Sequence, residues 1–403
     1  MTNHHPLTLH QTAVAVAAIV RANHVPLVMG PPGIAKTTLM RALAPLIGRL
    51  LDLDEYPVED CILSNRESVD VGGFPVVVPN HHHGATVELQ LFGTLRRAAE
   101  RPSLLFLDEL LTCSQSVQGP AMRLVRERVA GEVPLHPLTR IVCASNPAEQ
   151  APGGIQLTAP LANRLVILYV RPLVEEIALY FAGDAGAELV GDIALPDDTT
   201  WTARRQALRH AVSGALQSQP DLVVLDTPPD ASIHNGAPFA SPRAWEMCCD
   251  CLAALPASAE TDNAITRAIA VGTLGDVGLT FLKLIRARAF LPTIDEVLTA
   301  PDTCPLPDPN RVVTDPITGE ERALGRDASF AVIGLALEAA RQDTWATWVY
   351  VNRCPAEVRA AVARAMTDKI DTSRHGTKGS PWFKQGQQAM LKNTTEISRD
   401  VGN

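Results

Sequence analysis

The stretch "LVMGPPGIAKTTL", residues 27–39, decides the fold of this chain. It joins a short apolar run to a segment with helical spacing, which predicts a strand, a tight turn and a helix. Its pattern is that of a phosphate-binding loop: a glycine, four residues, a second glycine, a lysine and a serine or threonine. Alanine takes the place of the second glycine. The predicted loop consists of Gly30, Pro31, Pro32, Gly33, Ile34, Ala35, Lys36, Thr37 and Thr38.

Each part of such a loop has a physical task. Successive backbone amides at the start of the helix point at the phosphates of a nucleotide. Lys36 is predicted to reach the β- and γ-phosphates, and Thr37 to hold Mg²⁺ through its hydroxyl. Ala35 costs little if its φ is negative, because its methyl group can then point away from the ligand. The alternative is a glycine-rich turn that binds nothing.

Further apolar runs extend the prediction to a whole domain. Besides residues 25–29, buried strands are predicted within residues 103–110, 140–147 and 164–170. The segments between them are predicted to be helix or loop. Strands that alternate with helices indicate an α/β domain with a largely parallel sheet flanked by helices. In such sheets ligands bind beyond the carboxyl ends of the strands.

Three polar residues follow predicted strands at that edge. Asp108 and Glu109 end the run "LLFLDEL", and Asn146 follows "RIVCAS". Asp108 is expected to orient Mg²⁺ or its water, and Glu109 to act as the general base on the attacking water. The amide of Asn146 can hold that water against the γ-phosphate. The alternatives are two helix-capping carboxylates and an Asn-Pro turn.

The chain changes character beyond residue 171, where helical spacing replaces the alternation. "SPRAWEMCCDCLAAL", for example, opens with a Ser-Pro helix start and is apolar on one face. We predict a nucleotide-binding α/β domain over residues 1–171 and a helical lid domain over 172–290. Residues 291–403 are predicted to be a C-terminal extension, in which a proline-rich, acidic linker leads to further helices.

Composition limits the classes of function. The 403 residues are 46% hydrophobic and carry a formal net charge of −9. This apolar content suffices for a sizeable core. The acidic balance disfavours a broad nucleic-acid or acidic-membrane footprint. The start of the chain shows no signal-peptide pattern and no membrane-length apolar run, so we expect a cytoplasmic protein without membrane contact.

The ordered motifs resemble those of the AAA+ ATPases, specifically the MoxR-type branch. "GPPGIAKTT" is similar to the phosphate loop of that branch, in which alanine before the lysine is usual. "LLFLDEL" resembles its second motif and "ASNP" its first sensor. The resemblance covers roughly residues 5–290. It implies a P-loop AAA+ core followed by a helical lid, with ATP and Mg²⁺ as cofactors.

The resemblance also assigns two arginines. "LTAPLANRLV" resembles the arginine-finger segment, which implies that Arg164 reaches the ATP of a neighbouring subunit. "FASPRAWE" resembles the second-sensor motif, which implies that Arg243 senses the γ-phosphate of its own subunit. A guanidinium suits both tasks because its fork of donors matches phosphate oxygens. Alternatively, both are surface salt-bridge residues. The possible helpers near the subunit interface are Arg123, Arg126 and Arg128 with Glu127.

Residues 66–92 lie between the first two motifs and resemble a hairpin insertion that faces the ring pore in this branch. Gly72 and Gly73 would give it flexibility, and Phe74 an apolar tip. It is predicted to be a pore loop that grips a protein partner. A plain surface hairpin is the alternative.

The resemblance implies a hexameric ring motor that uses ATP hydrolysis to remodel, activate or load a protein client. A partner with a von Willebrand factor A domain is expected. One alternative is a nucleic-acid motor of the restriction-system type, which would need a basic channel interleaved with aromatic residues. Another is a nucleotide switch that does not hydrolyse ATP, which the presence of Glu109 disfavours.

Overall fold

The computed structural model describes residues 6–80, 84–147, 156–182, 190–191, 193–256, 263–288, 291–314, 321–323, 325–367 and 381–400. The chain forms two compact units, one made of Met1–Thr202 with Val224–Gly278 and the other of Ala203–Val223 with Leu279–Asn403. The three-part division at residues 171 and 290 stays a prediction. Within the described ranges, no helix has both the length and the apolar character that crossing a membrane requires.

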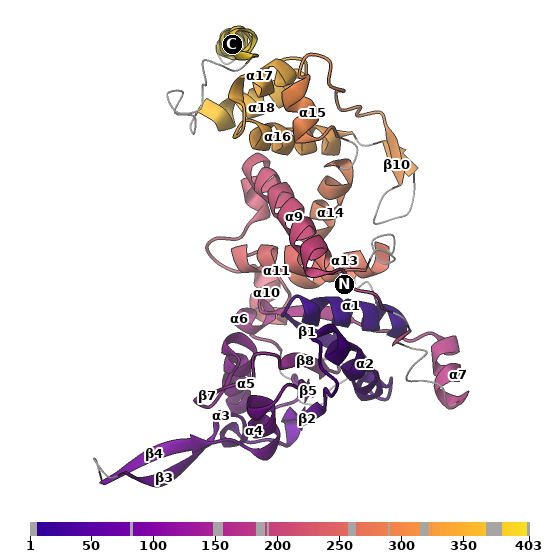
Figure 1. The fold of residues 1–403 in the computed structure, drawn as a ribbon, viewed down its shortest axis with the longest axis vertical. Coiled ribbons are helices and arrows are strands. Elements are labelled where there is room, and N and C mark those ends of the chain that lie inside the picture. The colour runs from indigo at the N-terminus through magenta and orange to yellow at the C-terminus, as the bar shows by residue number, and fades with distance from the viewer. Residues whose placement is uncertain are drawn as a thin grey trace. The chain divides into compact units, whose positions relative to one another are not determined.

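A five-stranded parallel sheet forms the centre of the first unit (Figure 1), in the order β2-β5-β8-β1-β9. Leu27 of the central strand β1 pairs with Cys143 of β8 on one side and Ile167 of β9 on the other. The fold is therefore a P-loop α/β core, as predicted. The strands are β1 (Val25–Met29), β2 (Val58–Ile62), β5 (Leu104–Asp108), β8 (Arg140–Ser145) and β9 (Leu165–Tyr169).

The edge strand β2 corrects the sequence prediction, which gave helix or loop for residues 58–62. Its side chains alternate between intermediate and buried positions, and Glu59 and Asp60 interrupt the apolar pattern. A strand at a sheet edge pairs on one side only, so polar residues are tolerated in it. The sequence pattern of a buried strand therefore does not apply to this one.

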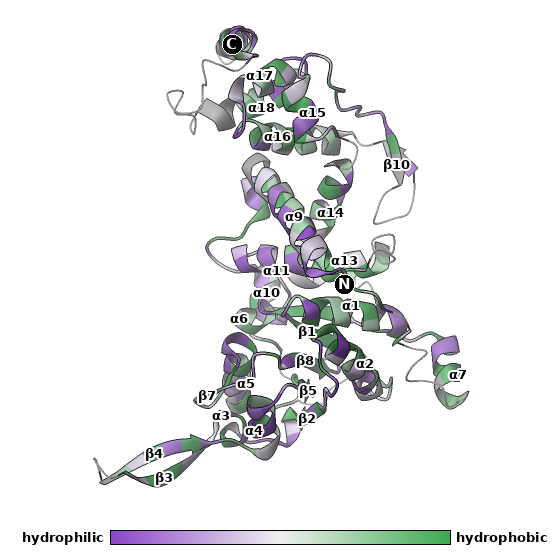
Figure 2. Ribbon diagram, viewed as in Figure 1, coloured by the Kyte–Doolittle hydropathy of each residue, from purple (hydrophilic) through white to green (hydrophobic). Residues whose placement is uncertain are grey.

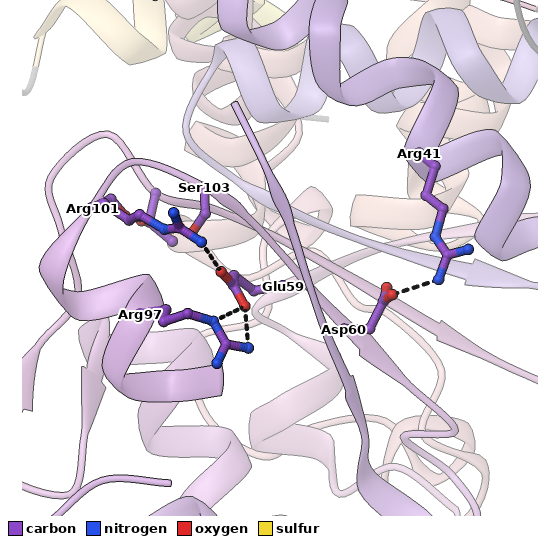
Figure 3. A network of polar contacts seen from close by, with 7 residues as sticks. Arg41, Glu59, Asp60, Arg97, Arg101 and Ser103 are labelled. Atoms are coloured by element: carbon purple, nitrogen blue, oxygen red, sulfur yellow. Dashed lines mark hydrogen bonds and ion pairs between the residues drawn. The ribbon is translucent and has the colours of Figure 1, made fainter. Parts of the chain in front are cut away.

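A network of ion pairs holds β2 to its surroundings (Figure 3). The buried Glu59 carboxylate accepts hydrogen bonds from Nε of Arg97 at 2.8 Å and from Nη2 of Arg101 at 3.0 Å. Burial works to raise the pKa of Glu59, but the bonds from these two guanidinium groups outweigh it and hold that pKa below its usual value. Asp60 accepts a bond from Arg41 at 2.8 Å.

Helices cover both faces of the sheet. Val25, Leu27 and Met29 of β1 share one core with apolar side chains of α4 (Gly93–Glu100) and α5 (Gln115–Glu127). The opposite layer contains three helices, of which α1 contacts the other two: α1 (Leu9–Arg21), α2 (Lys36–Leu50) and α13 (Asn263–Leu274).

α13 packs on the sheet very closely. A Cβ atom added to Gly272 would lie 2.2 Å from the carbonyl oxygen of Ile167 in β9, so only glycine fits at this point. This helix comes from the segment predicted to be a lid, and its packing joins that segment to the α/β unit.

The remaining elements of the first unit include an extended hairpin, formed by β3 and β4, that projects from the core (Figure 1). Its strands pair antiparallel from Phe74 opposite Gln90 to Asn80 opposite Gly84, so Phe74 lies at the base of the hairpin and not at its tip as predicted. His81–His83 lie outside the described residues. The elements are α3 (Ser68–Gly72), β3 (Phe74–Asn80), β4 (Gly84–Gln90), β6 (Val129–Ala130), β7 (Val133–Pro134), α6 (Ala159–Ala162), α7 (Val174–Ala182), α10 (Asp230–Asn235) and α11 (Pro242–Ala253).

The second unit is mainly helical, as expected for the C-terminal part of the chain. The stretch predicted to be a linker nevertheless contains a helix, α15, which begins at a capping box on Thr293 and buries Val297 in a core with Trp348. α9 (Asp198–Ser218) and α14 (Val277–Arg288) cross the unit boundary. The other elements are α15 (Ile294–Thr299), β10 (Val312–Thr314), β11 (Glu321–Ala323), α16 (Arg326–Ala339), α17 (Thr344–Val351), α18 (Ala356–Thr367) and α20 (Phe383–Asp400).

Candidate nucleotide site

A cavity of about 520 Å³ lies in the first unit, at the carboxyl edge of the sheet. It brings together the predicted lysine, hydroxyl, carboxylates and amide from three separate strand ends. None of the described arginines lines it. The lining residues are Leu9, Pro32, Gly33, Ile34, Ala35, Lys36, Thr37, Thr38, Asp108, Glu109, Asn146, Pro172, Glu176, Ile177 and Phe181.

Two residues of the phosphate loop have a left-handed backbone conformation. Gly33 has φ +79° and Ala35 has φ +64°, so the negative φ at which alanine would cost little is not what the structure shows. Left-handed residues in such a loop turn successive amides toward one concave side, where an anion binds. Ala35 is the N-cap of α2 and its side chain caps no amide, which leaves the first amides of the helix for a ligand.

The Lys36 ammonium group connects the loop to the neighbouring strand end. Its Nζ donates to the carbonyl oxygens of Gly30 at 2.8 Å and Pro31 at 3.0 Å, and to Oδ1 of Asn146 at 2.8 Å. Burial lowers the pKa of Lys36, and the carboxylates of Asp108 and Glu109 act against that shift. The predicted lysine and sensor asparagine are therefore in direct contact.

The two acidic residues at the end of β5 differ in their surroundings. Asp108 accepts a bond from the amide of Glu109 at 2.8 Å. Burial raises the pKa of Asp108, and that amide bond and the Lys36 charge oppose the rise. Glu109 has φ +59° and accepts a hydrogen bond from the hydroxyl of Ser64, which follows β2. Ser64 was not predicted as a site residue, because the strand before it, β2, was not predicted either.

The donor set fits Mg²⁺. The hydroxyl of Thr37 and the carboxylate of Asp108 line one cavity, and both offer the hard oxygen atoms that this ion prefers. The cavity also leaves room for phosphate oxygens and water, which complete the coordination in sites of this kind.

Glu176, like Ser64, is a residue of the site that no sequence motif predicted. Its carboxylate, 8% exposed, accepts bonds from the amides of Leu9 at 3.0 Å, His10 at 2.9 Å and Leu173 at 2.9 Å. It thus satisfies amides at the starts of both α1 and α7. This fixes two helix starts against each other beside the cavity.

Arg164 and Arg243 lie together, away from the cavity. Arg164 directly precedes β9 and so lies at the amino edge of the sheet, whereas the cavity is at the carboxyl edge. Arg243 lies in the first turn of α11. Burial lowers the pKa of Arg164, and the nearby charges of Arg243 and Arg126 lower it further. The Nε atom of Arg164 is buried and has no partner among the described residues.

Hydrogen bonds between Asn163 and Ser241 connect the two chain segments that carry these arginines. Nδ2 of Asn163 donates to Oγ of Ser241 at 2.7 Å, and this buried hydroxyl also accepts from the amide of Ala244 as the N-cap of α11. Because Asn163 and Ser241 are close neighbours in sequence of Arg164 and Arg243, the link fixes the two chain segments that carry them.

The three predicted helper arginines have different surroundings. Nε of Arg123 donates to Glu127 at 3.0 Å, and Nε of Arg126 lies 3.8 Å from the same carboxylate. Arg128 turns toward the loop after α1, where Nη2 donates to the carbonyl oxygen of Asn23 at 3.0 Å. Of the three, Arg126 is the one whose charge acts on Arg164.

Comparisons with known proteins include a distant likeness to a solved structure. No family model matches the chain, and no curated protein matches it. The crystal structure of a protein from Cytophaga hutchinsonii, described as a "putative ATPase", is similar over 60% of this chain and 71% of that chain, with 14% identity and a TM-score of 0.36. At that TM-score the similarity does not support an inference about function, so the function proposed below is argued from the residues of this chain alone.

Proposed function

We propose that this protein binds and hydrolyses ATP with Mg²⁺, in a ring where each cavity is completed by arginines of the adjacent subunit. One observation carries the proposal. The cavity contains lysine, hydroxyl, carboxylate and amide groups for a triphosphate but none of the described arginines, while Arg164 and Arg243 gather at the opposite sheet edge. Two incomplete halves at opposite edges fit head-to-tail assembly, which forms a ring when the rotation between subunits closes.

Within one subunit the residues divide the chemistry. The loop amides and Lys36 bind the β- and γ-phosphates, and Thr37 and Asp108 would hold Mg²⁺, which neutralises charge on the phosphates. Glu109 would accept the proton of the attacking water, and Asn146 would orient that water. The bond from Lys36 to Asn146 supports a coupling between the proposed sensor and the phosphate loop.

For Arg243 we propose a role that differs from the one implied by the resemblance. Its position beside Arg164 favours action on the neighbour's nucleotide, together with Arg164, over sensing the γ-phosphate of its own subunit. An anion between these guanidinium groups would relieve their repulsion. Arginine fingers of this kind are worth roughly 10³ to 10⁵ in rate.

More specifically, we propose a hexameric, cytoplasmic motor of MoxR type. It would remodel or load a protein client and act with a partner that has a von Willebrand factor A domain. The β3–β4 hairpin supports a client-gripping role. Val77 and Val87 are directly opposite each other on it and are 68% and 63% exposed. Exposed apolar pairs of this kind favour contact with a protein over contact with a phosphate backbone.

Mixing two inactive variants tests the shared site. Lys36→Ala should lose ATP binding, and Arg164→Ala should bind ATP but lose turnover. Combined, they should recover part of the phosphate release, because some interfaces pair an intact loop with an intact arginine. A mixture of Lys36→Ala with Arg96→Ala, an exposed arginine of α4, supplies the reference for ordinary dilution of active subunits. No recovery in the first mixture would refute a site shared between subunits.

The client is found by trapping. Glu109→Gln should bind ATP and hydrolyse it slowly, which holds the ring in its ATP-bound state. Capture from a lysate with this variant and ATP, and with Lys36→Ala as the control, should enrich a protein client or a von Willebrand factor A domain protein. Enrichment of DNA instead would favour the nucleic-acid motor.

A further inference from the structure

Some residues that line the cavity have no role in the proposed phosphate chemistry. Besides the loop and the strand ends, it is lined by Leu9, Pro172, Ile177 and Phe181. These residues are apolar and come from the start of α1, from α7 and from the segment after β9. A triphosphate held at the loop by Lys36 and Thr37 carries its nucleoside away from the carboxylates, into the remaining part of a cavity of this size.

The apolar wall belongs to a helix that leaves large side chains exposed. In α7, which Figure 2 shows as largely hydrophobic, Val174 is 76% exposed, Ile177 42% and Phe181 81%. These three positions are three and four residues apart, so they lie on one helix face. An exposed apolar face that lines a ligand cavity is a surface that the ligand itself can cover.

Glu176 fixes the orientation of this face. Its two carboxylate oxygens already accept three amide hydrogen bonds, from Leu9, His10 and Leu173. The carboxylate is therefore committed to the helix starts. With the first turn of α7 held in this way, Ile177 and Phe181, one and five positions later, border the cavity together.

We propose that α7 forms the base-binding wall of the nucleotide site, with the Phe181 ring stacking on the base and Ile177 packing beside it. The ligand part recognised is a planar aromatic base. Stacking suits it because each base offers an apolar face, and removing an aromatic partner typically weakens binding several-fold to a hundredfold per base. The inference rests on the proposed nucleotide site and specifies how that site distinguishes a nucleotide from a bare triphosphate.

The test compares ATP with inorganic triphosphate, which has the same phosphate chain and no base. Binding of each, with Mg²⁺, is measured by titration calorimetry on the full chain. Phe181→Ala should weaken ATP binding about tenfold or more and leave triphosphate binding unchanged. Phe181→Tyr should retain ATP affinity. Leu179→Ala is the matched control, because Leu179 is an exposed residue of the same helix, 39% exposed, that does not line the cavity.

The outcomes separate this inference from the proposed function. Lys36→Ala should weaken both ligands, and if it weakens neither, the phosphate site itself is wrong. If Phe181→Ala leaves ATP binding unchanged, or weakens ATP and triphosphate equally, the base wall is refuted while the phosphate site stands. A direct readout is Phe181→Trp, whose added fluorescence, relative to the unsubstituted protein, should change with ATP and stay constant with triphosphate.

Discussion

At the residue scale, Ala35 holds a backbone conformation that its side chain disfavours. Its φ of +64° costs an L-residue roughly 1–2 kcal/mol. Ala35→Gly removes that strain, although glycine loses about 0.4–1 kcal/mol through the entropy of the unfolded chain. We therefore expect the free energy of unfolding to stay level or rise by about 1 kcal/mol, measured by chemical denaturation.

The matched control for this prediction is Ala42→Gly. Ala42 lies inside the same helix, α2, where glycine costs about 1 kcal/mol relative to alanine. A loss of stability in Ala35→Gly equal to that in Ala42→Gly would show that the left-handed alanine carries no strain.

Residue types and spacing predicted the chemical groups of the site but not their conformations. Lys36, Thr37, Asp108, Glu109 and Asn146 line one cavity because parallel strands bring their carboxyl ends to one edge. The left-handed φ of Ala35 was missed because alanine ordinarily avoids that region, and the phosphate loop overrides the preference.

At the element scale, β2 depends on the carboxylate of Glu59. The pKa of Glu59 is held below its usual value in the folded chain, so its ion pairs stabilise the fold at pH above about 4.3, the unfolded value. That contribution is lost as the pH falls through the lower, folded pKa. Glu59→Gln should reduce the free energy of unfolding by roughly 1–3 kcal/mol at neutral pH.

The same comparison at acid pH is the decisive measurement. The difference between Glu59→Gln and the unsubstituted protein should shrink once the pH is below the folded pKa, since the carboxyl is then protonated in both states. Glu100→Gln, at an exposed ion pair of α4, should change stability by less than about 1 kcal/mol throughout. A difference for Glu59→Gln that does not vary with pH would contradict the role of its charge.

The helix starts at the cavity depend on Glu176. Glu176→Ala leaves three amides without their acceptor, and we expect a loss of roughly 2–4 kcal/mol in unfolding free energy. Glu176→Gln, which keeps an acceptor oxygen, should lose less. Glu175→Ala is the control at an exposed neighbour. Equal small losses for all three variants would show that water replaces the carboxylate.

Elements were predictable where the apolar pattern was continuous. The strands β1, β5, β8 and β9 are buried on both faces and were predicted from short apolar runs. β2 was missed because an edge strand tolerates charged residues. α15 was missed because prolines and acids around it suggest a linker, although Val297 anchors it in a core.

At the scale of the whole molecule, the proposed site needs a second copy of the chain. Glu109→Gln with ATP and Mg²⁺ should form a larger assembly in sedimentation velocity than the same variant without nucleotide. Adding Arg164→Ala should reduce that assembly, because the neighbour's triphosphate loses a cationic partner. A single species of unchanged size under all these conditions would argue against the ring.

The sheet edge at which a predicted residue lies could not be read from its motif. The Ser-Pro start of α11 predicted a helix correctly, and Arg243 does lie in its first turn. Nothing in that local pattern shows that Ser241 bonds to Asn163 and so brings Arg243 to the amino edge. This is a long-range contact, and a helix-start signal contains only local information.

The contacts of the Lys36 ammonium have a consequence for the rigidity of the phosphate loop. By bonding to the carbonyls of Gly30 and Pro31 and to Asn146, it ties the loop to itself and to the end of β8. These three bonds should make the loop resist protease cleavage. A nucleotide that engages Lys36 would exchange some of them for phosphate contacts, which would favour rapid capture and easy release in the proposed ATPase.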